Sequence, residues 1–199
     1  SFQLRGLRDE YNLRIPLIGE HQLENAATAV AVAEVLAELG AIIEKESIIN
    51  GIACVSWPGR LQILQREPWV VVDGAHNADS VRRMVKALKQ HFSFDRAIII
   101  FGASSDKNIS GMVAELKSFP GTVIVTQSRH PRAVATDKLV SEFCKQGITV
   151  EVSGSVASAI ELALARAKPA DLICATGSLF VVGEVIEEVD RLGRLLGKD

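Results

Sequence analysis

The chain has 199 residues, of which 48% are hydrophobic, and its formal net charge is −2. That length is enough for one large domain, or for one domain and part of another. The charge balance excludes the basic footprint of a nucleic-acid-binding protein, and no apolar run approaches the roughly 18 residues of a membrane-spanning helix.

The three cysteines, Cys54, Cys144 and Cys174, are scattered and match no metal-binding or redox spacing. An odd number also argues against a disulfide framework. Because each lies among apolar residues, we expect all three to be small core residues. Together with the lack of a visible signal peptide, this usage favours a cytoplasmic protein.

The first part of the chain predicts a hairpin followed by helices. Loosely alternating apolar residues over 1–18 are typical of a β-hairpin. It begins at once, with no leader or cap, so we expect that the chain was cut from something longer. A long helix is expected over His21–Leu39, closed by Gly40, and a shorter one over about Ser47–Val55.

The start of the long helix is unusually polar. His21, Gln22 and Asn25 share one face, because they lie three and four residues apart. Amide side chains offer paired donors and acceptors that suit the edge of a purine. The alternative is that these groups only cap the helix and face solvent.

The clearest break in the chain is Ser56–Arg60, where a proline and a glycine halt the helical pattern. We interpret it as the joint between residues 1–57 and a second domain, residues 58–199. Arg60 follows the glycine directly, where a guanidinium could reach a phosphate or a ribose. An arginine at a loop end is nevertheless often only solvated.

After the joint, strands and helices alternate. A short strand at 61–64 is expected at an edge. Further strands are expected at about 69–73, 97–101, 122–126, 148–152 and 171–175, with helices at about 79–91, 109–118, 135–146, 155–167 and 180–195. This alternation predicts βαβ units with right-handed crossovers. The expected fold class is α/β: a Rossmann-like, mostly parallel sheet with helices on both faces and one antiparallel edge strand.

Polar residues follow the predicted strands. Asp73 and His76 come directly after the apolar run Val70–Val72, Lys107 follows the next strand, and Ser178 follows the last. Because ligands bind outside the carboxyl ends of strands in open α/β sheets, these residues predict a small-molecule site. Plain turn and capping chemistry is the alternative. Neither of the usual glycine-rich phosphate-binding motifs is present.

Four segments occur in the order found in folylpolyglutamate synthases and bifunctional dihydrofolate synthases of the Mur ligase superfamily. They are Gly19–Ala27, Trp57–Arg60, Asp73–Asn77 and Thr176–Leu179. From about residue 19 to about residue 185, the chain resembles the C-terminal part of these enzymes. The sequence Asp-Gly-Ala-His-Asn favours the folate branch over the cell-wall branch, where an aromatic residue usually follows the aspartate.

The resemblance implies a fold and an activity. Residues 1–57 would be the end of a central ATP-binding domain, and residues 58–199 the C-terminal Rossmann-like domain. The activity would be the joining of L-glutamate to a folate, or dihydropteroate, carboxylate through an acyl phosphate made with ATP. The P-loop domain and the ligands of Mg²⁺ would lie upstream, so this chain alone should be inactive. The sheet edge would form half of an interdomain cleft.

The resemblance also implies roles for single residues on the nucleotide side. Gln22 and Asn25 would meet adenine. Arg60 and Asp73 would reach the phosphates and the ribose of ATP, with Arg60 also at the hinge.

On the acceptor side, His76 would lie near the γ-phosphate and the incoming glutamate. Lys107 and Ser178 are further candidates for binding glutamate. The expected catalytic set is therefore His76, Asp73 and Arg60. Two alternatives remain open, namely the C-terminal domain of a Mur-type peptide ligase and an α/β binding domain without chemistry of its own.

Overall fold

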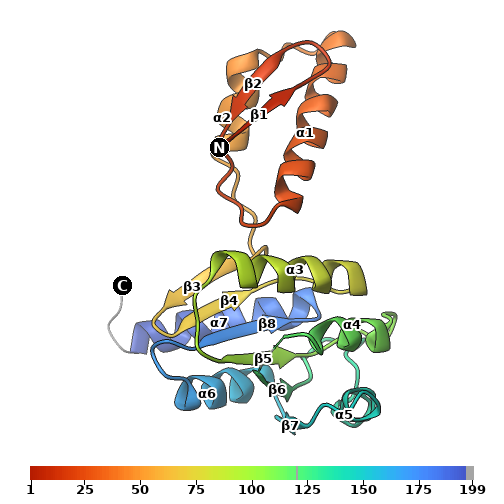
Figure 1. The fold of residues 1–199 in the computed structure, drawn as a ribbon, viewed down its shortest axis with the longest axis vertical. Coiled ribbons are helices and arrows are strands. Elements are labelled where there is room, and N and C mark those ends of the chain that lie inside the picture. The colour runs from red at the N-terminus through yellow and green to blue at the C-terminus, as the bar shows by residue number, and fades with distance from the viewer. Residues whose placement is uncertain (120, 196–199) are drawn as a thin grey trace. The chain divides into compact units, whose positions relative to one another are not determined.

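The computed structural model describes residues 1–119 and 121–195. The chain divides into two compact units, Ser1–Pro58 and Gly59–Asp199 (Figure 1). Within the described residues, no helix combines the length and the apolar character needed to cross a membrane. That the first unit is the end of an ATP-binding domain stays a prediction.

The first unit is a β-hairpin packed against two helices. Its elements are β1 (Phe2–Arg5), β2 (Glu10–Leu13), α1 (His21–Glu38) and α2 (Lys45–Ala53). The strands are antiparallel, with Phe2 opposite Leu13. Their apolar faces meet the helices in a small core that contains Tyr11, Val30 and Ile48. The predicted hairpin is confirmed.

A buried carboxylate holds the turn of this hairpin. Glu34 of α1 is 1% exposed and accepts hydrogen bonds from the backbone N–H groups of Leu7, Arg8 and Asp9, at 2.6, 3.0 and 3.1 Å. The Tyr11 hydroxyl donates a fourth bond, at 3.0 Å. These donors would otherwise be unpaired, so the carboxylate of this one helical residue fixes the conformation of the turn.

The second unit is a six-stranded sheet with helices on both faces. Its elements are β3 (Gln62–Arg66), β4 (Trp69–Val72), α3 (Ala78–His91), β5 (Ala97–Phe101), α4 (Ile109–Leu116), β6 (Gly121–Val125), α5 (Thr136–Lys145), β7 (Val150–Val152), α6 (Val156–Arg166), β8 (Leu172–Thr176) and α7 (Leu179–Leu195). The strand order is β3-β4-β8-β5-β6-β7. All neighbours are parallel except β3, which runs antiparallel to β4 at the edge. The predicted fold class is confirmed.

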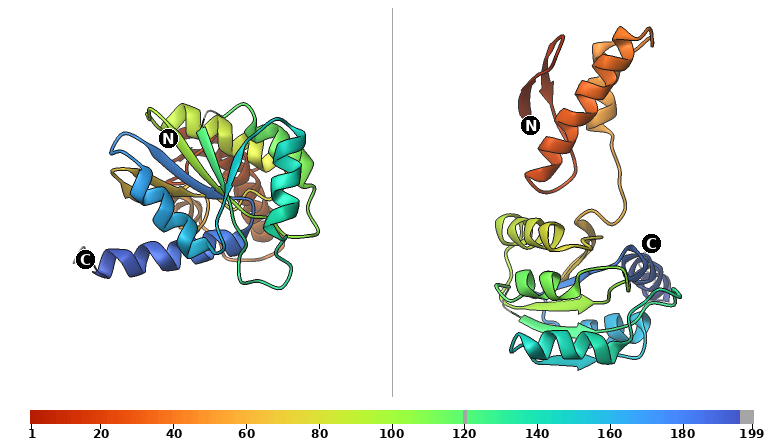
Figure 2. Two further views of the ribbon diagram at one scale, coloured as in Figure 1. Left: turned by 90° about the horizontal axis from the view of Figure 1, so that it is seen from below. Right: turned by 90° about the vertical axis from the view of Figure 1, so that its right-hand side faces the viewer.

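The direction of each crossover decides which face a helix covers. The chain moves toward the β7 edge of the sheet as it passes from β4 through β5 and β6 to β7. It then returns in the opposite direction to β8, between β4 and β5. Right-handed crossovers therefore place α3, α4 and α5 on one face and α6 on the other, and α7 packs beside α6. Figure 2 shows the two groups of helices on opposite sides of the strands.

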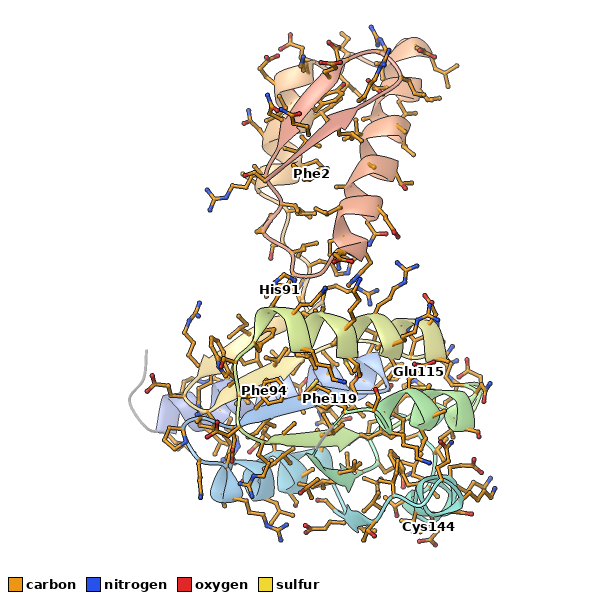
Figure 3. The ribbon with its side chains drawn as sticks, in the orientation of Figure 1. Phe2, His91, Phe94, Glu115, Phe119 and Cys144 are labelled. Carbon is orange, nitrogen blue, oxygen red and sulfur yellow. The ribbon has the colours of Figure 1, made fainter. Side chains whose placement is uncertain are left out.

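Both faces of the sheet are buried in apolar contacts, as continuous apolar strands predict. On one face Val72, Ile100 and Ala175 pack against α6 and α7. On the other, the rings of Phe101 and Phe143 lie 5.3 Å apart, edge to face. Figure 3 shows Phe94 near Phe119, and their ring centroids lie 5.6 Å apart.

The expectation for the cysteines is correct only in part. Cys174 on β8 is fully buried, but Cys54 and Cys144 are exposed. Cys144 lies in the last turn of α5 (Figure 3), and Cys54 directly follows α2. Their apolar sequence neighbours predicted burial wrongly because, in a helix, adjacent residues point in different directions.

Candidate functional site

The strand order creates a switch point at the carboxyl ends of β4, β8 and β5. Strand β8 lies between the other two, and its following helix α7 covers the opposite face of the sheet from α3 and α4. Connections that leave neighbouring strands toward opposite faces open a crevice above the strand ends. The loops at this switch point begin at Asp73, Gly177 and Gly102.

Asp73 lies at the end of β4 and is 6% exposed. Its Oδ1 accepts a hydrogen bond from the Ala75 N–H and its Oδ2 one from the Leu61 N–H, both at 2.9 Å. Burial raises the pKa of this carboxyl group, although the two amides oppose the rise. Electrostatic interaction with Arg60 and His76 also opposes the rise.

His76 is held in one tautomer. Its Nδ1 lies 2.9 Å from the carbonyl oxygen of Gly74, which can only accept, so Nδ1 carries the proton. The neutral ring therefore keeps a lone pair on Nε2, the nitrogen suited to accept a proton or to meet a ligand. Its backbone N–H donates to Ser80 Oγ, 3.0 Å away. Asn77 caps α3 by accepting from the Ser80 N–H, so the capping alternative holds for Asn77.

Ser178 lies at the next strand end, directly before α7. It is 4% exposed, and its Oγ accepts a hydrogen bond from the Phe180 N–H, 3.2 Å away, as a helix cap would. Gly177 before it has a φ of +96°, and a Cβ there would lie 2.4 Å from the Gly102 carbonyl oxygen. Only glycine suits this position, because the three strand ends are packed backbone to backbone. The Gly177 N–H donates to Ala75 O at 3.0 Å, which joins this loop to the Asp73 loop.

Lys107 does not join the residues around Asp73. Its ammonium forms an ion pair with Asp106, at 2.8 Å. Its side chain lines a hollow of about 410 Å³ between the start of α4 and α5, together with Lys138 and Lys145. The prediction that this loop lies at the carboxyl edge of the sheet is correct, but the Lys107 side chain points toward α5.

Gln22 and Asn25 belong to the first unit. Gln22 is 4% exposed, so it is not the solvated helix end that the alternative expected. Its amide group donates to His21 Nε2 and accepts from Asn25 Nδ2, both at 3.0 Å. A contact of this polar group with adenine stays a prediction.

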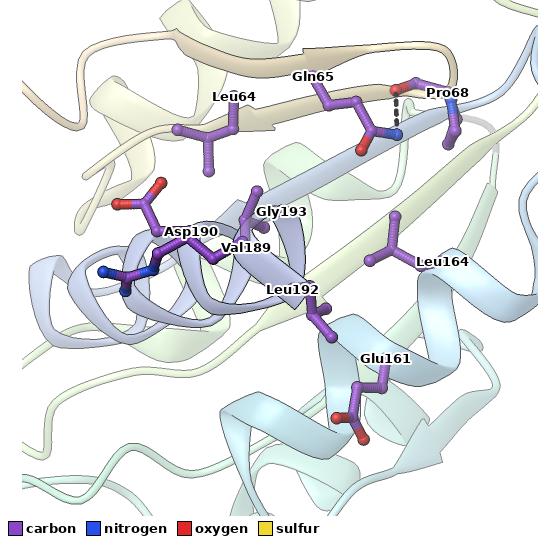
Figure 4. A pocket seen from close by; sticks show the side chains of 10 residues that line it. Leu64, Gln65, Pro68, Glu161, Leu164, Val189, Asp190, Leu192 and Gly193 are labelled. Carbon is purple, nitrogen blue, oxygen red and sulfur yellow. Dashed lines mark hydrogen bonds between the residues drawn. The ribbon is translucent and has the colours of Figure 1, made fainter. Parts of the chain in front are cut away.

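A hollow among the described residues lies away from these strand ends. It has a volume of about 830 Å³ and is walled by β3, α6 and α7, with Leu64, Leu164 and Leu192 among its lining (Figure 4). Gln65 and Pro68, which also line it, lie at the hairpin that precedes β4, so this hollow is at the amino end of that strand. Its lining includes none of Arg60, Asp73, His76 and Ser178.

No metal centre is formed by the described residues, because nowhere in them do three His, Cys, Asp or Glu side chains come together to hold an ion. The residues around Asp73 instead supply one carboxylate, one guanidinium and one imidazole. Such a set suits a polyanion and a proton transfer better than a metal ion.

Sequence reasoning missed two residues that shape this site. Gln62 is the first residue of β3, and its Oε1 accepts a hydrogen bond from the Gly59 N–H at 2.9 Å. Leu61 is a buried non-glycine residue with a positive φ of 42°. Nothing in the local sequence marks either one, because both depend on the pairing of β3 with β4.

Comparison with known proteins finds one family over most of the second unit. The family described as "Mur ligase, glutamate ligase domain" matches residues 59–179. A probable bifunctional folylpolyglutamate synthase/dihydropteroate synthase of Haloferax volcanii is 36% identical over 174 residues, which are 87% of this chain and 20% of that protein.

Solved structures of the same kind of enzyme also resemble this chain in fold. The folylpolyglutamate synthase of Mycobacterium tuberculosis complexed with ADP matches with a TM-score of 0.83 and 29% identity, over 94% of this chain and 44% of that one. A bifunctional folylpolyglutamate synthase/dihydrofolate synthase with Mn, AMPPNP and L-glutamate bound matches with a TM-score of 0.78 and 26% identity, over 92% and 43%. This chain thus spans less than half the length of each.

Proposed function

The chain belongs to the Mur ligase family of glutamate ligase domains, and from that premise we propose that it forms the C-terminal part of an ATP-dependent ligase that adds L-glutamate to a folate. The observation that carries the proposal is that hydrogen bonds join the segments of Arg60, Asp73 and His76 at the switch point of the sheet. The names of the relatives, which are folylpolyglutamate synthases, support the choice of substrate.

The proposed reaction has two steps. The γ-phosphoryl group of ATP passes to a carboxylate of the folate, which gives an acyl phosphate and ADP. The amino group of glutamate then attacks the acyl carbon, phosphate leaves, and the nitrogen loses a proton. Charge on the transferring phosphoryl group must be neutralised, and water must be kept from the acyl phosphate.

The three grouped residues match these needs. Arg60 offers a permanently charged fork for phosphate oxygens. Because His76 is protonated on Nδ1, its Nε2 can accept the proton that the attacking amine loses. Asp73 has one hydrogen bond on each oxygen, so each keeps a lone pair that a ribose hydroxyl could use.

The remaining assignments belong to the same proposal. Gln22 and Asn25 would contact adenine, and Ser178 would contact glutamate. Lys107 would reach glutamate only after its side chain turned away from Asp106 and α5. A structural relative with AMPPNP, Mn and L-glutamate bound supports these ligand classes. Magnesium would assist the phosphoryl transfer, but the described residues do not fit a metal site, so its ligands would lie in the part of the ligase that this chain does not span.

We further propose that the ligase works in the cytoplasm and also accepts dihydropteroate. The three free cysteines support a reducing compartment. The names of the relatives support a bifunctional enzyme. This chain alone should not turn over, because residues for the P-loop are missing from it.

The proposal is tested by ADP release from the full-length protein with folate or dihydropteroate as acceptor substrate. Release should require glutamate as well. Arg60→Ala should lower kcat/KM by roughly 10²–10³-fold, as expected for the loss of one charge-stabilising group. Arg66→Ala, which removes an exposed arginine from the far end of β3, is the matched control and should change little. Turnover only with a cell-wall precursor would overturn the proposal in favour of a Mur-type peptide ligase.

A further inference from the structure

The short turn that carries Arg60 is fastened to the end of the sheet. We define the 59–61 turn as Gly59, Arg60 and Leu61. Before Arg60, the Gly59 N–H donates to Gln62 Oε1 at 2.9 Å, and the Gly59 carbonyl oxygen accepts from the Gly74 N–H at 2.8 Å. After it, the Leu61 N–H donates to Asp73 Oδ2 at 2.9 Å. The backbone is therefore held on both sides of Arg60.

The backbone angles of this turn need such support. Leu61 has a φ of 42° and is 2% exposed, and non-glycine residues rarely adopt this conformation. Gly59 has a φ of +73°, and a Cβ there would lie 2.9 Å from Val182 Cγ1. Strained residues persist only where their surroundings over-determine them, and they are common at functional sites.

The antiparallel direction of β3 explains how the turn reaches the site. Because β3 runs opposite to β4, with Gln62 paired to Val72, its first residue lies at the carboxyl end of β4. A parallel edge strand would have placed its amino end, and the turn before it, at the other end of the sheet. The edge strand thus brings the 59–61 turn to Asp73.

We propose that Gln62 and Asp73 are positioning residues, which hold the backbone on both sides of Arg60 so that its guanidinium is presented at the carboxyl edge of the sheet. In this role Gln62 needs no contact with substrate. Arg60 then moves as part of the second unit and is not itself a hinge. The inference rests on the proposed function for what Arg60 does in the reaction.

Two variants separate positioning from general stability. Gln62→Ala removes the acceptor of the Gly59 N–H, whereas Gln62→Glu keeps an oxygen there. Gln65→Ala is the matched control, because Gln65 lies on the same strand and bonds instead to the Glu67 and Pro68 carbonyl groups. The melting temperature of each full-length variant shows whether it folds.

The first measurement is amide hydrogen exchange over residues 59–62, which needs no activity. Exchange should be slow in the wild type and in Gln65→Ala, and at least tenfold faster in Gln62→Ala. Fast exchange in the wild type would overturn the proposal, whatever reaction the protein catalyses.

The second measurement is a double-mutant cycle on the glutamate-dependent release of ADP. Gln62→Ala should lose roughly tenfold or more in kcat/KM, because small misplacements of a charge-stabilising group are costly, and Gln62→Glu should recover most of it. In an Arg60→Ala background, Gln62→Ala should lose almost nothing further. Losses that multiply would show that Gln62 acts independently of Arg60. A wild type without this activity would refute the proposed function, and the exchange result would still decide whether the turn is held.

Discussion

Replacing Glu34 by glutamine should destabilise the first unit strongly, although Glu34 is far in sequence from the groups that it binds. In the structure, Oε1 accepts from the Arg8 and Asp9 N–H groups and the Tyr11 hydroxyl, and Oε2 accepts from the Leu7 N–H. A glutamine can keep its oxygen at the first position only. Its NH₂ group then faces the Leu7 N–H, donor against donor.

The magnitude follows from these four bonds. Leaving the partly buried Leu7 N–H without an acceptor costs about 1–3 kcal/mol. The three remaining bonds weaken, because bonds to a charged acceptor are about twice as strong as bonds to a neutral one. Part of this loss is offset, since a neutral amide is easier to bury than a carboxylate. We therefore expect Glu34→Gln to lower the free energy of unfolding by roughly 2–4 kcal/mol.

Urea unfolding, combined with amide exchange at residues 7–9, measures the effect in this unit. Tyr11→Phe is the matched control, because it removes one bond and leaves the charge, and it should cost about 1 kcal/mol. If Glu34→Gln were no more destabilising than Tyr11→Phe, the carboxylate would not be the anchor of the hairpin turn.

The same carboxylate predicts a pH dependence. Burial tends to raise the pKa of Glu34, but the three backbone amides and Tyr11 lower it overall. Its contribution to stability is therefore present above the unfolded pKa of about 4.3 and is lost as the pH falls through the lower folded value. Burial and Glu34 raise the pKa of Tyr11 to about 12, so its contribution is lost only as the pH rises toward that value. If the free energy of unfolding of Glu34→Gln fell in acid as steeply as that of the wild type, this assignment would be contradicted.

Two further predictions concern the second unit. Gly177→Ala should lower the free energy of unfolding by roughly 2–5 kcal/mol, because the backbone is left-handed there and the new Cβ would be crowded. Gly183→Ala is the control on α7, where the new Cβ meets open space, and it should raise the free energy of unfolding by up to about 1 kcal/mol. Equal effects of the two substitutions in urea unfolding would contradict the tight packing of the strand ends. Hydrogen bonds from the Lys168 N–H and Arg96 lower the pKa of the buried Asp171 carboxyl. Asp171→Asn should therefore lower the stability above pH about 4 and make the stability of the protein fall less in acid. Thermal melts across pH 3–7 would check this.

Much of the second unit follows from the order of residues alone. Continuous apolar strands that alternate with helices predict a parallel sheet, and the strand-end rule then brings Asp73, His76 and Ser178 to one edge. These predictions succeed because they use patterns that repeat over a few residues and a rule that holds for the whole fold class.

The same reasoning could not find Glu34, Gln62 or the strained Leu61, and it misjudged the exposure of Cys144. Glu34 has the local sequence of an ordinary helix residue, yet it is buried by a turn that lies more than 20 residues earlier. Gln62 matters because an edge strand returns antiparallel beside β4.

The spacing of apolar and polar residues along the chain is therefore enough to predict the kind of sheet and the edge at which its polar site residues lie. Which polar groups are paired, and which remain available to a ligand, depends on the folded arrangement of distant segments. Hydrogen bonds between distant segments depend on how strands align and how loops turn, and no local pattern carries that information.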